Sequence, residues 1–339
     1  MTTTEHRPSH SDPAPVAEAE AEPIRIMTRH GDDVRVTSGM PAVRAAIAGS
    51  APFWIDLREP EPPVVDEVAG LLGLHPLIAE DIERRQERPK VAVFENAIHV
   101  VVFSLTFDRE VHVDEVDFVL GQRYLLSVHG PDWRPDAAAA ARRDSKPGGD
   151  RGPDYVLWSL LDGIVDAYFP ALDRLGDELD DVQDEIIRRP TPAMLQRVFH
   201  LKRELLQMRR SVTPARDLLN VLTNRDLALI QPHHLVYFRD VYDHLIRATD
   251  EIDTDRDLVA GAIDAYLSTV NNNLSLIMKR LTGVTVILAG IGAIAGIFGM
   301  SEAGSALNAQ EAPGFWLVTG LVVALAVAAA VVLRRIDWI

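Results

Sequence analysis

Two stretches near the C-terminus, Leu281–Ser301 and Phe315–Leu333, contain no charged residue. At about 1.5 Å of rise per helical residue, roughly 20 residues cross the ~30 Å hydrocarbon core of a bilayer. Lipid offers the backbone no hydrogen-bond partner, so a stretch that crosses it folds as a helix. A buried core helix is the alternative, but two such stretches in tandem favour a transmembrane hairpin at 281–339, with spans at about 281–300 and 315–333.

Basic residues predict the orientation of this hairpin. Lys279 and Arg280 precede the first span and Arg334 and Arg335 follow the second, whereas the connection at 301–314 has no base. Because Lys and Arg are enriched on the cytoplasmic side, we expect a multi-pass protein of the cell's inner or plasma membrane with both termini in the cytoplasm. Two spans cannot enclose a water-filled path, so transport would need several copies around an axis.

Composition excludes several classes of function. The chain has no cysteine, which excludes disulfides, iron–sulfur clusters and thiol catalysis. Its net charge of −16 argues against a nucleic-acid partner. The chain has no G-x-x-x-x-G-K-[ST] phosphate loop for ATP and no recognisable catalytic set, so we expect no enzyme. Residues 1–23 are polar, lack the apolar core of a secretory signal, and are expected to be a disordered tail.

The soluble part divides into two regions. Strand-like and short helical runs alternate from Ile24 to about His129, which predicts a cytoplasmic α/β domain with mixed strands at 24–150. An Ala-rich helix is expected at 135–143 to close this domain. The pattern after Pro153 is helical and predicts a stalk domain at 151–280.

Two helices of the stalk stand out. A strongly acidic helix is expected at Asp154–Arg189. No proline interrupts Leu235–Met300, so a single helix on the order of 100 Å long is expected to run into the first span. The His233-His234 pair precedes it in a turn marked by proline, and we expect these side chains to be solvated rather than to bind a metal.

One face of the first span carries small or weakly polar residues. Steps of three and four residues place on one stripe Ser275, Met278, Thr282, Thr285, Ala289, Gly292, Gly296 and Gly299. One interpretation is a packing seam of the Gly-xxx-Gly kind. The other is the lining of a narrow pore, in which hydroxyls and backbone carbonyls face the axis. Both interpretations can hold at once.

Several ordered motifs carry a resemblance to a known family. They are HPLIAEDIERRQERPKVAVFEN at 75–96, RPTPAMLQRVFHLKRELLQMRR at 189–210, YFRDVYDH at 237–244, AYLSTVNNN at 265–273, MKRLT at 278–282 and AGIFGM at 295–300, with the basic end RRIDWI. In order and spacing they resemble the CorA family of magnesium channels. The resemblance implies an α+β integral membrane protein that forms a funnel-shaped homopentamer, in which the stalk helix becomes the pore-lining span and the second span lies outside it.

The resemblance also implies a regulatory metal site. Asp81 and Asp240 match a pair that binds Mg²⁺ between neighbouring subunits, and Glu80 and Asp162 lie near a second such ion. Carboxylates that face each other across an interface repel unless a hard cation with oxygen ligands bridges them. Loss of the ion at low cytoplasmic Mg²⁺ would therefore loosen the ring and open the pore.

The remaining implied positions belong to the pore. Met278 and Leu281 match a hydrophobic constriction that gates by excluding water. The full set of pore-lining positions is Ser275, Met278, Leu281, Thr282, Thr285, Ala289, Gly292 and Gly296. The selectivity entrance falls at Gly299, Met300, Ser301 and Glu302, where this chain has Gly-Met-Ser in place of the family's Gly-Met-Asn. The serine side chain is shorter and offers one oxygen, which makes the entrance wider and less specific for hydrated Mg²⁺.

Three functions are compatible with these observations. The first is a CorA-type channel for Mg²⁺ or a related divalent cation, gated by intracellular ion. The second is a branch of the family that prefers Zn²⁺ or Co²⁺, or that works in export. The third is a non-conducting membrane protein that keeps the oligomer and the ion sensor and acts as a regulatory partner.

Overall fold

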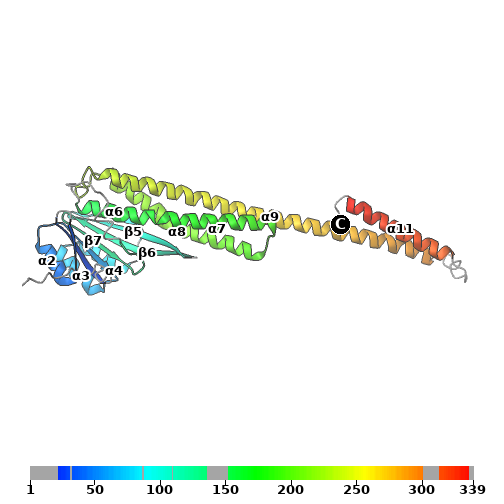
Figure 1. Cartoon of the computed structure of the whole chain (residues 1–339), viewed down its shortest axis with the longest axis horizontal. Coiled ribbons are helices and arrows are strands. Elements are labelled where there is room, and N and C mark those ends of the chain that lie inside the picture. The colour runs from blue at the N-terminus through cyan, green and yellow to red at the C-terminus, as the bar shows by residue number, and fades with distance from the viewer. Residues whose placement is uncertain are drawn as a thin grey trace, which may run out of the picture. The chain divides into compact units, whose positions relative to one another are not determined.

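The chain is described here from a computed structural model, which covers residues 22–30, 33–85, 88–108, 110–135, 152–300 and 313–335 (Figure 1). It forms two compact units. The first comprises the chain up to Asp181 together with Val198–Val259, and the second comprises Val182–Arg197 together with Ala260–Ile339. Nearly all of the predicted tail at 1–23, and all but the first residue of the Ala-rich helix predicted at 135–143, lie outside the described residues.

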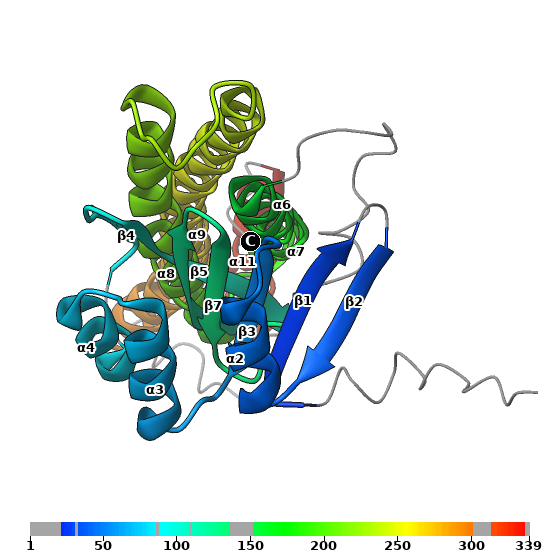
Figure 2. The same cartoon turned by 90° about the vertical axis from the view of Figure 1, so that its left-hand side faces the viewer.

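Seven strands of the first unit form one mixed sheet (Figure 2). Their order is β2-β1-β3-β7-β6-β5-β4, and β3 pairs with β7 in parallel whereas the other neighbours are antiparallel. The strands are β1 (Ile24–His30), β2 (Asp33–Ser38), β3 (Phe53–Arg58), β4 (Lys90–Val93), β5 (Ala97–Asp108), β6 (Glu110–Gly121) and β7 (Tyr124–His129). The mixed α/β arrangement predicted from the sequence is confirmed.

Three short helices cover one face of this sheet, namely α2 (Met40–Ala48), α3 (Pro62–Leu72) and α4 (Pro76–Arg84). Each has a proline in its first turn, where the missing N–H is no loss. Apolar side chains of these helices and of the strands form a buried core. On α4, Ile78 and Ile82 are four residues apart and both point into that core, which fixes how α4 sits on the sheet.

The opposite face is in contact with α6 (Pro153–Asp166), which lies against β5, β6 and β7. The predicted single helix at Asp154–Arg189 is wrong, because the structure ends α6 at Asp166 and starts α7 (Tyr168–Arg188) after a turn at Ala167. Pro170 explains the break. Its nitrogen has no hydrogen to donate to the carbonyl of residue 166, and its ring would collide with that carbonyl in a continuous helix.

Side chains of two helices hold the long hairpin formed by β5 and β6. On α8 (Pro192–Asn224), the Glu204 carboxylate accepts a hydrogen bond of 2.7 Å from the Val111 N–H, and Gln207 donates one of 3.0 Å to the Val111 carbonyl. On α7, the Tyr168 hydroxyl donates to the Phe103 carbonyl. The buried Glu204 therefore has a backbone donor, which offsets the cost of burying its charge.

A buried ionic cluster joins strands β1, β3 and β7. The Asp56 carboxylate accepts from Arg25 Nε at 3.1 Å and from the Ser127 hydroxyl, and lies 3.2 Å from His129 Nε2. Burial alone would raise the pKa of Asp56, but His129, Arg25 and Ser127 together hold that pKa below its usual value. The carboxylate therefore stays ionised, and its partners tie strands β1, β3 and β7 together.

The C-terminal helices are α9 (Leu235–Met300) and α11 (Pro313–Arg335) (Figure 1). The uninterrupted helix predicted at Leu235–Met300 is confirmed, with 66 residues. Among the described residues, one helix, α9, is long and apolar enough to cross a membrane. Its most apolar stretch of 18 residues has a mean hydropathy of 1.8, and 6% of that stretch is buried.

The turn before α9 corrects the expectation that both histidines there are solvated. His234 is buried and its Nδ1 lies 2.7 Å from the Asp154 carboxylate, which also accepts from the Gln231 N–H. His233 is exposed, as predicted. Asp154 stands in the first turn of α6, where a negative charge is favourable, and through His234 it fixes the start of α9.

One acid on α9 is buried without a full set of partners. Asp255 is 8% exposed, and its Oδ2 has no hydrogen-bond partner among the described residues. Burial first, and then the negative charges of Glu251 and Asp180, raise the pKa of Asp255 to about 6. Because the folded protein binds this proton more tightly than the unfolded chain, the ionised carboxylate destabilises the fold.

We therefore expect Asp255→Asn to stabilise the protein at high pH. Its benefit is small near pH 4, grows as pH rises from about 4 to about 6, and levels off at about 1–2 kcal/mol above pH 6, where Asp255 is ionised in the folded wild type too. Thermal unfolding of the purified protein in detergent, measured between pH 4.5 and 8, checks this. Asp253→Asn is the control, since Asp253 has ion pairs with Arg209 and Arg256 to lose. A gain from Asp255→Asn that does not change with pH would contradict the assignment.

Candidate metal centre and ion path

In the first unit, α6 and the N-terminal part of α9 bring together three side chains of types that can hold a metal ion. Asp162 of α6 and Asp240 and His244 of α9 each offer one ligand atom, and these atoms all lie within 4.8 Å of one another. Asp240 and His244 are four residues apart and therefore share one face of α9. Asp162 is buried, whereas Asp240 is exposed, so the group opens to solvent on one side.

The surroundings of His244 orient its ring toward these acids. Its Nδ1 lies 3.6 Å from an Asp166 oxygen and 4.0 Å from an Asp162 oxygen. The ring of Phe169 packs edge-on against it, with centroids 6.1 Å apart. Carboxylates with one imidazole suit Mg²⁺ through the oxygens and Zn²⁺ or Co²⁺ through the nitrogen as well.

Of the four acids predicted to bind regulatory ions, the structure brings only two together within one chain. Asp162 and Asp240 meet, but neither Asp81 nor Glu80 belongs to their group among the described residues. Sequence reasoning missed His244, although the motif YFRDVYDH contains the signal, an Asp and a His spaced by four residues on a helix.

Asp81 and Glu80 lie on α4, and both have basic neighbours. Asp81 Oδ2 is 2.9 Å from Lys90 Nζ of β4 and 3.9 Å from His99 Nδ1 of β5. Glu80 forms an i,i+4 ion pair of 2.7 Å with Arg84. The Glu80 pair is exposed and contributes little to stability. Asp81 is half-buried and its cationic partner comes from another element, so its carboxylate is held in place.

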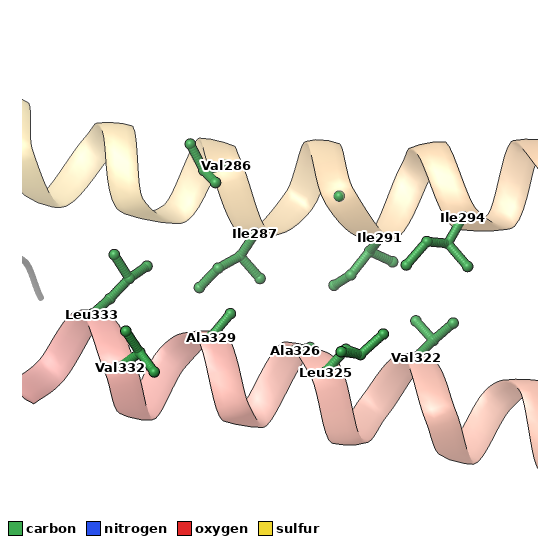
Figure 3. A pocket seen from close by; sticks show the side chains of 11 residues that line it. Val286, Ile287, Ile291, Ile294, Val322, Leu325, Ala326, Ala329, Val332 and Leu333 are labelled. Carbon is green, nitrogen blue, oxygen red and sulfur yellow. The ribbon is translucent and has the colours of Figure 1, made fainter.

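In the second unit, α11 lies alongside the C-terminal part of α9 (Figure 1). A hollow of about 400 Å³ separates the facing side chains. Figure 3 shows Ile287, Ile291 and Ile294 of α9 pointing toward α11, where they meet Val322, Ala329 and Leu333 among others. This face of α9 is apolar throughout.

The residues predicted to line a pore lie on the other side of α9. At about 100° per residue, the stripe from Ser275 to Gly296 is centred roughly 180° from the face formed by Ile287, Ile291 and Ile294. Every predicted pore-lining residue is exposed in the chain, namely Ser275, Met278, Leu281, Thr282, Thr285, Ala289, Gly292 and Gly296. The packing of α11 therefore leaves this small and weakly polar stripe uncovered.

The predicted entrance is only partly described. Gly299 and Met300 are the last residues of α9, and Ser301 and Glu302 lie outside the described residues. The glycines of the stripe are not used to bring α9 close to α11, because a Cβ added at Gly292 or Gly296 meets no atom within 4 Å. Gly292 and Gly296 therefore form no Gly-xxx-Gly seam with α11.

Comparisons with known proteins agree with this architecture. Residues 49–335 match the family model described as "CorA-like Mg2+ transporter protein". The "Cobalt/magnesium transport protein CorA" of Thermotoga maritima is 36% identical over 259 residues, which cover 74% of each chain. A more distant relative, the "Zinc transport protein ZntB" of Yersinia pseudotuberculosis, is 20% identical and covers 89% of this chain and 93% of its own.

A solved structure has the same fold. The CorA magnesium transporter from Methanocaldococcus jannaschii superposes with a TM-score of 0.75 at 22% identity, covering 93% of this chain and 98% of that chain. The likeness includes the soluble α/β part and the long helix. Since the family model spans most of the sequence and a relative above 30% identity covers three quarters of it, this chain belongs to the CorA-like Mg²⁺ transporter family.

Proposed function

We propose that the protein is a CorA-type channel through which Mg²⁺, or a related divalent cation, flows passively into the cytoplasm. Several copies, five by analogy with the family, would surround an axis lined by α9. The observation that carries the proposal is the uncovered stripe of α9, which offers hydroxyls, small residues and backbone carbonyls on the side away from α11. In a family of metal-ion transporters, a face that carries polar groups and is not covered by α11 is available to line a path.

Passive flow is sufficient for uptake. A divalent cation that enters a cell gains about 4.6 kcal/mol per 100 mV of inside-negative potential, twice the value for a single charge. With both termini in the cytoplasm, the segment at 301–314 would face outside, where its two acids, Glu302 and Glu311, attract cations. The entrance would be formed by Gly299, Met300, Ser301 and Glu302, with Ser301 giving a wider opening than an asparagine.

Gating would follow from the acids of the first unit. A divalent ion that joins Asp81 of one subunit to Asp240 of the next would hold the ring together, with Glu80 and Asp162 near a second ion. The half-buried position of Asp81 and the clustering of Asp162 with Asp240 support these assignments. Met278 and Leu281 would form the apolar constriction that closes when the ring tightens. The proposed boundaries are 24–150 for the cytoplasmic α/β domain, 151–280 for the stalk domain and 281–339 for the transmembrane hairpin.

Two other functions remain as candidates. A preference for Zn²⁺ or Co²⁺ is favoured by His244, since an imidazole beside carboxylates binds these ions better than Mg²⁺. The Thermotoga relative is named for cobalt and magnesium transport and the Yersinia relative for zinc transport. A non-conducting sensor or regulatory partner would keep the same acids without a flux. Measuring Mg²⁺, Co²⁺ and Zn²⁺ flux into liposomes that contain the purified protein separates the three.

We expect Gly292→Leu to block flux and Gly290→Leu to preserve it. Both glycines are in α9, and a Cβ at either meets no atom within 4 Å, so both variants should fold. Gly292 lies on the uncovered stripe, where a leucine would narrow the path and reduce Mg²⁺ flux at least tenfold. Gly290 borders the hollow beside α11, which has room for the added side chain. Ion flux into liposomes, normalised to reconstituted protein, is the measurement.

The reverse pattern would contradict the proposed path. If Gly290→Leu stops flux and Gly292→Leu does not, the path runs on the α11 side of α9. Size-exclusion chromatography of both variants checks that each assembles as the wild type does.

A second expectation concerns closure by cytoplasmic ion. Asp240→Ala should raise the internal Mg²⁺ concentration that half-closes the channel by about tenfold or more, because the bridging carboxylate is lost. Asp226→Ala removes an exposed acid in the turn before α9 and should leave closure unchanged. Flux is measured in vesicles with fixed internal Mg²⁺. Closure of Asp240→Ala at the wild-type concentration would remove Asp240 from the sensor.

A further inference from the structure

Beneath Asp81 lies a buried pair that the proposed gating does not use. His99 of β5 and Asp117 of β6 are joined by a contact of 2.8 Å between His99 Nε2 and Asp117 Oδ1. Their side chains are 0% and 1% exposed. The other ring nitrogen, Nδ1, lies 3.9 Å from Asp81 Oδ2. Three elements, α4, β5 and β6, thus align a carboxylate, an imidazole and a second carboxylate in a row from the surface to the core.

The hydrogen-bond pattern fixes which ring nitrogen is available. A carboxylate oxygen accepts, so the Nε2–H of His99 donates to Asp117. In the neutral ring, Nδ1 then presents its lone pair toward the Asp81 carboxylate, which has no hydrogen to give. Nδ1 has no hydrogen-bond partner among the described residues. A buried nitrogen that faces another acceptor is costly unless a proton or a metal cation lies between them.

The frame around this nitrogen is rigid. His99 and Asp117 are held in the antiparallel ladder of β5 and β6, where His99 is paired with Val119 and Asp117 with Val101. Asp81 is positioned by the core contacts of α4 that flank it in sequence, Ile78 and Ile82. The site is therefore built into the fold and does not depend on a loop.

We propose that Asp81 and His99 together bind a divalent transition-metal ion such as Co²⁺ or Zn²⁺. This rests on the proposed regulatory role of Asp81 and specifies its ion. Two ligand atoms that each lie about 2.1 Å from one ion are at most about 4.2 Å apart, and the observed 3.9 Å satisfies this limit. Imidazole favours Co²⁺ and Zn²⁺ over Mg²⁺, which prefers oxygen ligands and its own waters.

Asp117 and Lys90 complete the arrangement. A histidine that binds a metal usually donates its other N–H to a carboxylate, which orients the ring and strengthens it as a ligand, and Asp117 occupies that position. Lys90 Nζ, 2.9 Å from Asp81 Oδ2, supplies the positive charge when the ion is absent. The ion must displace this ammonium, so Lys90 sets the concentration at which the site fills.

The test compares Co²⁺ with Mg²⁺ on the full-length protein in detergent. The measured quantity is the concentration of CoCl₂ or MgCl₂ that gives half of the maximal rise in thermal unfolding temperature. The double variant His99→Phe/Asp117→Val removes the imidazole together with its carboxylate, so no buried charge loses its partner. It should raise the Co²⁺ midpoint at least tenfold and leave the Mg²⁺ midpoint within about twofold.

Matched variants separate this site from others. His233→Ala removes an exposed histidine in the turn before α9, outside both groups of acids, and should leave the ratio of the two midpoints within about twofold. Lys90→Met should lower both midpoints by about two- to fivefold, as loss of a partly exposed competing charge implies. If the double variant does not assemble, X-ray absorption at the cobalt edge of His244→Ala loaded with one Co²⁺ per chain should still show an imidazole nitrogen ligand.

The outcomes distinguish the proposed Asp81–His99 metal site from the broader proposal that Asp81 has a regulatory role. An unchanged Co²⁺ to Mg²⁺ ratio in the double variant, an equal rise of both midpoints, or no imidazole ligand in the absorption spectrum overturns the inference. If in that case Asp81→Ala still weakens the Mg²⁺ response, the regulatory role of Asp81 stands without it. If Asp81→Ala changes neither midpoint, the regulatory role itself fails.

Discussion

A backbone that enters hydrocarbon must satisfy every N–H and C=O inside its own segment, and the architecture of α9 depends on this constraint. The helix has no proline from Leu235 to Met300 and keeps its hydrogen bonds for all 66 residues. A continuous helix also fixes the direction of each side chain from its number. Within the membrane part, this periodicity is what separates the apolar face toward α11 from the small and weakly polar stripe.

Local signals in the sequence were sufficient for the features that depend on one segment. The absence of proline and of any other stop signal predicted α9, and the alternation of strand-like and short helical runs predicted the mixed sheet. The break at Ala167 was missed because the acidic pattern continues across it, although Pro170 alone is enough to stop a helix. The burial of His234 could not be predicted, since its partner Asp154 is 80 residues away and meets it only in the folded chain.

The residues proposed to bind a metal ion show the same division between what the sequence predicts and what only the fold reveals. Asp81, Asp162 and Asp240 were predicted through family motifs, and His244 was within reach because it follows Asp240 by one helical turn. The pairing of His99 with Asp117 could not be predicted from the sequence, because it depends on the register of β5 against β6. A shift of one residue would point both side chains to the other face of the sheet.

Both acidic regions share one chemical feature, a histidine next to carboxylates: His99 beside Asp81, and His244 beside Asp162 and Asp240. Oxygen ligands alone distinguish divalent cations mainly by size and hydration. Adding one imidazole nitrogen shifts the order of affinity toward ions such as Co²⁺ and Zn²⁺. In the cell, Mg²⁺ would then have to compete through its concentration, and the need to displace the Lys90 ammonium would raise the threshold for every ion at Asp81. Under these proposals, selectivity at the acidic groups would be set separately from selectivity along the stripe of α9, where hydroxyls and carbonyls are the available groups.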